Sequence, residues 1–224
     1  MALVGRVLLV WFALACACFA PGAVAFDSNA CASAASSTSL SWSHTCTGLN
    51  LVLVVGICES GSTDYVSSVT YGGQVLSKIG AFFAANGKVV VQYKIVAPTT
   101  GTHTVSITTS AAVNIGAVSQ SFTGANGNID SQQTQASGVF TFNLNPGDAV
   151  CDIEGCSGAP AFGDTYVNFV GVSGVGFVIG GSTLASGNSL TCGTGGSSPC
   201  AAAVRIHSGV QVKSSSGLAC MGVG

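Results

Sequence analysis

The chain has 224 residues, of which 48% are hydrophobic and only 6% are charged, and its formal net charge is −2. Ordinary soluble domains carry about 25% charged residues. So few charges exclude a basic patch for nucleic acid and a polybasic stretch for a membrane surface. Solubility must rest on Ser, Thr, Asn, Gln and Gly, or else neighbouring molecules cover much of the surface, as in an assembled protein.

The first 25 residues have the pattern of a secretory signal peptide. Arg6 precedes an apolar run over residues 7–19, and Ala23-Val24-Ala25 has the small-x-small form of a cleavage site. The run is short for a membrane span of about 20 residues, which makes a retained anchor the weaker interpretation. We predict cleavage after Ala25, a mature chain of residues 26–224, no membrane span after cleavage, and a secreted, extracellular location.

Strand patterns dominate the first half of the mature chain, and helix patterns are nearly absent. Residues 39–45 alternate polar and apolar, and residues 49–58 form an apolar run that predicts a central strand covered on both faces. The segment VSSVTYGGQVLSKI, residues 66–79, predicts two strands joined at Gly72-Gly73. Further strands are expected at 88–96, 102–108 and 115–122, and residues 124–128 have the composition of a turn.

The second half continues in the same style. Segments 139–144 and 149–153 flank Asn145-Pro146-Gly147-Asp148, a turn sequence in which proline presets φ and glycine permits a positive φ. Residues 166–179 are glycine-rich and too short for a membrane helix, so they predict a strand with a glycine bend. Strands are also expected at 204–213 and 218–223. Many short strands separated by turns predict one all-β domain over 26–224, a sandwich or barrel.

Eight cysteines follow the predicted leader, and an even number behind a signal peptide predicts disulfides. Eight cysteines allow 105 connectivities, and the three pairs that lie close in sequence are candidate disulfides. Zinc binding is the alternative, but no C-x-x-C and no zinc-finger spacing occurs. The three close pairs are Cys31–Cys46, Cys151–Cys156 and Cys192–Cys200.

Five segments in chain order carry a resemblance to a known module: NLVLVVG at 50–56, VSSVTYGGQ at 66–74, KVVVQYK at 88–94, PTTGTHTV at 98–105 and AVSQSFTG at 117–124. The series resembles an antiparallel β-sandwich module, immunoglobulin-like or jelly-roll in character, of secreted bacterial proteins and phage structural proteins. The resemblance covers about residues 40–127 and implies a scaffold without an assigned enzymatic role. In a jelly roll the strand at Leu51 and the last strand would be neighbours, which implies a Cys58–Cys220 disulfide. The cysteines themselves depart from the module and suggest adaptation to an oxidising exterior.

Residues with catalytic chemistry are few. His44 and His103 alternate with apolar residues and are interpreted as core or strand-end residues, and neither G-x-S-x-G nor H-E-x-x-H occurs. Asp152 and Glu154 would share a strand face, and paired carboxylates could serve a glycosidase. With Asp148 they are also calcium candidates, although the EF-hand spacing is missing. We predict no catalytic residue, no metal and no cofactor.

A loop before the 66–79 segment holds the candidate binding residues. Glu59 and Asp64 flank residues 60–63, and Tyr65 offers an aromatic face beside a carboxylate. The expected function is a secreted, non-enzymatic structural or adhesive protein of a cell surface, matrix or extracellular assembly. Its partners would be copies of itself or extracellular glycans and proteins. The alternative is a carbohydrate-binding, lectin-like module in which Tyr65 packs on a sugar.

Overall fold

The computed structural model describes residues 22–136, 139–156, 166–172, 176–184, 189–193 and 199–209. All regular elements in these ranges are β-strands, and every pairing is antiparallel. The predicted all-β antiparallel class is therefore confirmed. Within the same ranges, no helix has the length and apolar character needed to cross a membrane.

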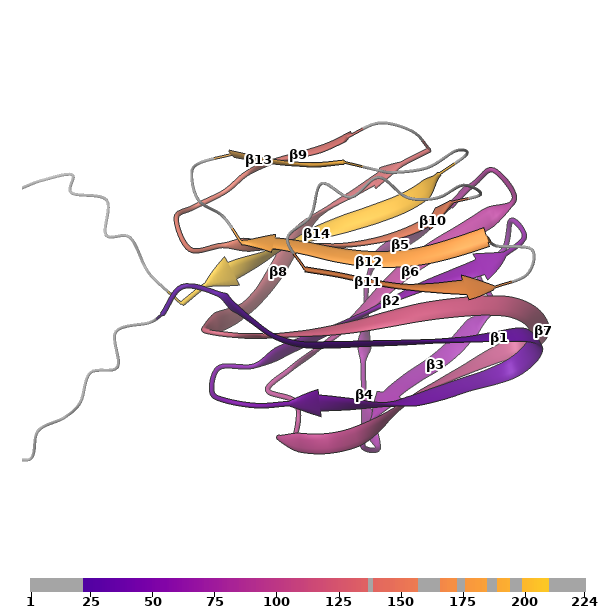
Figure 1. The fold of residues 1–224 in the computed structure, drawn as a ribbon, viewed down its shortest axis with the longest axis horizontal. Coiled ribbons are helices and arrows are strands. Elements are labelled where there is room, and N and C mark those ends of the chain that lie inside the picture. Colours follow the sequence, from indigo (N-terminus) through magenta and orange to yellow (C-terminus); the bar gives the residue numbers. More distant parts are fainter. Residues whose placement is uncertain are drawn as a thin grey trace, which may run out of the picture.

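The largest sheet has seven strands and folds back on itself (Figure 1). Its order is β4-β3-β7-β2-β6-β5, and β1 also pairs with β7. The first part of β7 pairs with β3 and the second part with β2, so this one long strand joins the two halves of the sheet. The strands are β1 (Ala25–Cys46), β2 (Val52–Ser60), β3 (Val66–Tyr71), β4 (Gln74–Val75), β5 (Ser77–Ala85), β6 (Lys88–Val96) and β7 (Gly101–Thr123).

Two smaller sheets cover the β2–β6 half of this sheet. The second sheet has the order β11-β12-β10-β14-β8, and the third pairs β13 with β9. Figure 1 shows the third sheet over the second, the second over β2, β5 and β6, and β3 and β4 on the far side. Their bounds are β8 (Ala125–Gln135), β9 (Val139–Asn143), β10 (Ala149–Cys156), β11 (Tyr166–Val172), β12 (Gly176–Leu184), β13 (Ser189–Gly193) and β14 (Cys200–Ser208).

Strand β2 separates the two main layers of the core. Leu53, Val55 and Ile57 point into the folded first sheet, where they pack in one buried cluster. Val54 and Cys58 alternate with them and face the second sheet. Side chains on a strand alternate between its faces, so an unbroken apolar run is stable only where both faces are covered. The predicted central strand is confirmed.

Glycines allow the first two sheets to approach closely. A Cβ placed on Gly56 of β2 would lie 2.6 Å from Cβ of Ile153 on β10. A Cβ on Gly180 of β12 would lie 2.6 Å from Cγ1 of Val118 on β7. Real Cβ atoms do not approach other heavy atoms this closely, so these two positions set the spacing between the sheets.

Several predicted boundaries are wrong. Segments 102–108 and 115–122 belong to one strand, β7, because β1 pairs with it on both sides of the intervening residues. Of the predicted turn at 124–128, only Gly124 lies between strands, and residues 125–128 are the start of β8. The segment 166–179 is not one bent strand, since it contains β11 and the beginning of β12. A two-sheet sandwich is not confirmed, because three sheets occur and the first is folded.

The predicted disulfides are not present at bonding distance among the six cysteine side chains that the structure describes. Cys151 and Cys156 lie five residues apart on β10, which separates their Cα atoms by roughly 16 Å and excludes a bond. Cys31 packs against the cluster between the first two sheets, whereas Cys46 is buried inside the folded sheet. The Cys192 side chain and Cys220 lie outside the described residues.

The predicted cleavage point lies at the start of the first strand. Residues 1–21 of the predicted leader are outside the described ranges, and Ala25 is the first residue of β1. Val24 is buried beside Phe122, and its N–H donates to the carbonyl of Gly147 at 2.8 Å. A chain cleaved after Ala25 would lack this contact.

Candidate functional site

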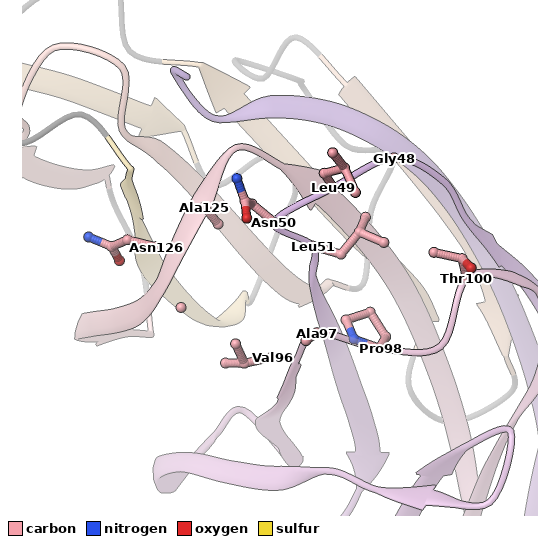
Figure 2. A pocket seen from close by; sticks show the side chains of 11 residues that line it. Gly48, Leu49, Asn50, Leu51, Val96, Ala97, Pro98, Thr100, Ala125 and Asn126 are labelled. Carbon is pink, nitrogen blue, oxygen red and sulfur yellow. The ribbon is translucent and has the colours of Figure 1, made fainter. Parts of the chain in front are cut away.

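An open cleft of about 340 Å³ lies at one end of the first sheet. It is formed by residues 48–51 between β1 and β2, by residues 96–98 and Thr100 at and after the end of β6, and by residues 125–127 at the start of β8. Figure 2 shows Leu49, Leu51, Val96 and Pro98 among the side chains that line it. Since no charged residue lines this apolar cleft, it suits an apolar or uncharged polar group.

Backbone hydrogen bonds hold the walls of the apolar cleft together. The N–H of Ala97 donates to the carbonyl of Leu51 at 2.9 Å, and that of Ala125 donates to Asn50 at 3.1 Å. Asn50 and Ala97 have φ angles of 54° and 53°. Asparagine adopts this conformation readily, but it costs an alanine about 1–2 kcal/mol, and such strain clusters at ligand sites. The strained Ala97 therefore belongs to the rim of the cleft, and Leu49 on the same rim is 71% exposed.

The predicted Glu59–Tyr65 loop is closed by its own carboxylates. The Tyr65 N–H donates to Glu59 Oε2 at 3.0 Å, and the Val66 N–H donates to Asp64 Oδ1 at 3.0 Å. The other Asp64 oxygen pairs with the Lys78 ammonium. The structure brings the three predicted residues together, with Tyr65 and Asp64 half-buried and Glu59 fully buried.

Glu59 is an unusual carboxyl group in this loop. Its Oε1 is buried and accepts no hydrogen bond within the described part of the chain. The pKa of Glu59 is raised to about 7, mainly by burial and to a smaller extent by the nearby Asp64, while the Tyr65 N–H and Lys78 act in the opposite direction. Glu59 therefore exchanges a proton near neutral pH, and its Oε2 accepts the hydrogen bond from the Tyr65 N–H.

A buried polar network joins the two halves of β1 through β7. His44, only 2% exposed, has Nδ1 2.9 Å from Ser119 Oγ and Nε2 3.0 Å from Ser121 Oγ. Trp42 Nε1 donates to Ser119 Oγ at 2.9 Å, and Ser121 Oγ donates to Asp27 Oδ2 at 2.7 Å. Every proton has an acceptor when Nε2 of His44 is protonated and Nδ1 accepts from Ser119.

The network is a structural connection and not an accessible catalytic centre. Ser119 and His44 lie at the distance of a nucleophile and its base, but the Ser119 side chain is fully buried and a substrate cannot reach it. Desolvation lowers the pKa of His44 to about 4, against the opposing effect of Asp27. The ring is therefore neutral at pH 7. Asp27 and the two serines were missed in the sequence, because the folding of β1 that brings them to His44 has no local signal.

The acidic residues near β10 stabilise the fold. Asp148 Oδ2 accepts from the N–H of Asn145 at 3.0 Å, and its Oδ1 accepts from Ser208 at 2.9 Å. Asp152 Oδ1 accepts from the N–H of Gly181 on β12 at 2.7 Å. Asp152 and Glu154 are both buried, so a sugar does not reach them. No group of three or more potential metal ligands occurs in the ranges that the structure covers.

Comparison with protein families, with curated proteins and with solved structures gave no match.

Proposed function

We propose that the protein is a secreted, non-enzymatic structural or adhesive protein of a cell surface, matrix or extracellular assembly. Its scaffold would be a variant of the immunoglobulin-like or jelly-roll sandwich, stapled by disulfides. The observation that carries the proposal is the apolar cleft, where Leu49 and Val96 are exposed beside the strained Ala97. An exposed leucine such as Leu49 gains roughly 1–2 kcal/mol when a partner covers it.

A paired substitution tests whether the apolar cleft mediates self-association. We expect Leu49→Asn with Val96→Thr to weaken association about tenfold, because one exposed leucine contributes one to two kcal/mol when buried. Sedimentation velocity over a concentration series gives the dissociation constants. Val75→Thr is the matched control, because Val75 is 72% exposed, as Leu49 is, but lies on β4. A wild-type chain that stays monomeric and binds neither cells nor matrix would contradict the proposal.

Carbohydrate binding is the second candidate, and it is favoured by the half-buried Tyr65 beside Asp64. Tyrosine stacks an apolar ring on a sugar while a carboxylate accepts hydrogen bonds from its hydroxyls. We expect Tyr65→Ala to abolish any glycan retention without loss of folding, whereas Thr63→Ala in the same loop leaves it unchanged. A glycan array read with both variants gives the result, and equal binding by Tyr65→Ala would remove this candidate.

A further inference from the structure

Two buried cysteines meet between the first and second sheets. Cys58 on β2 and Cys200 on β14 are both fully buried and belong to one apolar cluster with Val90, Val118 and Ile153. The two strands are in different sheets, and the residues are about 140 positions apart in the chain. A bond between them would therefore join the two layers covalently.

The strand registers bring the side chains of the two cysteines to the same part of the interface between the sheets. Cys200 lies opposite Gly155 in the β10–β14 ladder, and a Cβ on Gly155 would be 2.3 Å from Cys58 Sγ. Thus Cys58 Sγ occupies the space that the missing Gly155 side chain leaves beside Cys200. Cys200 Sγ also donates to the carbonyl of Lys88 on β6 at 3.5 Å. Lys88 lies two residues before Val90, which pairs with Cys58 in the β2–β6 ladder.

The alternation of β14 directs Cys200 away from its predicted partner. Ala201 and Ala203 pack against the phenylalanines of β9 in the third sheet. Cys200 and Ala202 point to the opposite face, towards the first sheet. Cys192 lies on β13 of the third sheet, so a Cys192–Cys200 bond would require Cys200 to leave the face it occupies.

We infer that Cys58 and Cys200 form a disulfide in the oxidised protein, in place of the Cys58–Cys220 and Cys192–Cys200 pairs that the sequence suggested. Two thiols lose two protons and two electrons as the S–S bond forms, and an exchanging disulfide such as oxidised glutathione accepts them and becomes two thiols. The proposed extracellular location would supply that oxidant. Burial raises the pKa of the Cys58 thiol well above its usual value, so the bond must form before the sheets close.

Differential alkylation of the full chain tests the pairing. The reduced, unfolded chain is refolded with oxidised and reduced glutathione and then unfolded in N-ethylmaleimide. After reduction it is labelled with iodoacetamide, and the label on each cysteine is read by mass spectrometry. We expect iodoacetamide on both Cys58 and Cys200. Cys58→Ala should place N-ethylmaleimide on Cys200, and Cys200→Ala should place it on Cys58, whereas the control Cys151→Ala leaves both with iodoacetamide.

A second measurement covers variants that do not fold. Chymotryptic and glutamyl-specific cleavage of the non-reduced wild-type chain should give a peptide that links Cys58 to Cys200 in tandem mass spectra. Reduction of the wild-type protein should lower its Tm by about 10 °C, because the bond closes a long loop. A peptide linking Cys58 to Cys31, Cys156 or Cys220, or N-ethylmaleimide on wild-type Cys58, would overturn the inference. Because refolding is done in vitro, this result is separate from the outcome of the self-association and glycan-binding tests.

Discussion

Gly56→Ala is expected to destabilise the protein by about 3 kcal/mol, and Gly56→Val to prevent folding. The added Cβ meets Ile153 at 2.6 Å, and it meets the root of that side chain, which cannot rotate away. Gly56 also lies in the middle of β2, between β6 and β7, so the strand cannot shift without breaking both ladders. Urea denaturation followed through Trp42 fluorescence gives the free energy of unfolding.

Two further variants separate overlap from backbone strain. Gly73→Ala adds a Cβ in open space at a φ of 83°, so it should cost only about 1 kcal/mol. In an Ile153→Ala background the cost of Gly56→Ala should fall, because the Cγ1 and Cδ1 contacts at 2.9 and 3.0 Å are gone. Equal stability of Gly56→Ala and wild type would show that β2 and β10 are not stacked at this distance.

Glu59→Gln is expected to stabilise the protein by about 2–3 kcal/mol at pH 8 and to have no effect at pH 4. The folded pKa of Glu59 is about 7, above the ordinary 4.5. Below pH 4.5 the carboxyl is protonated in both states. Between 4.5 and 7 it ionises only in the unfolded chain, so stability falls as pH rises, by up to 1.36 kcal/mol per pH unit. Glutamine keeps the acceptor for the Tyr65 N–H without the buried charge.

His44 gives the opposite slope over nearly the same interval. Its folded pKa of about 4 lies below the ordinary 6.5, so the unfolded chain binds the extra proton and stability falls as pH decreases from 6.5 to 4. The two slopes nearly cancel in the wild-type protein. Denaturation at half-unit pH steps should therefore give a flat profile for wild type and a profile that rises with pH for Glu59→Gln. Parallel profiles for the two proteins would contradict the assignment to Glu59.

Local patterns predicted the strands whose burial is regular. The 49–58 run and the 88–96 segment became β2 and β6, and both strands are buried on both faces over most of their length. The Gly72-Gly73 turn also occurs as predicted, and both residues have positive φ. The first half of β1 and the strand β8 were not predicted, since Ser, Ala, Asn and Gln there have little strand propensity and pair only because β7 and β14 lie beside them.

Sequence patterns predicted only the candidate site whose residues are close together in the chain. Glu59, Asp64 and Tyr65 lie within one loop, so the sequence was sufficient to group them. The apolar cleft combines residues near positions 49, 97 and 126, and the His44 network joins residues 27 and 121. Neither can be read from spacing, because the folding of the first sheet brings these segments together.

The pairing of β1 with β7 also sets the order in which the chain can fold. Ala25 pairs with Thr123, so the first strand has no partner for its N-terminal half until about 100 further residues are present. Such long-range pairing carries a high loop-closure cost and is typical of proteins that fold in milliseconds to seconds. Residues 28–46 contain no Asp, Glu, Lys or Arg. While this segment is unpaired, it therefore has no side-chain charges of these types to repel other chains. Association before folding, rather than instability afterwards, is the main risk that this topology creates.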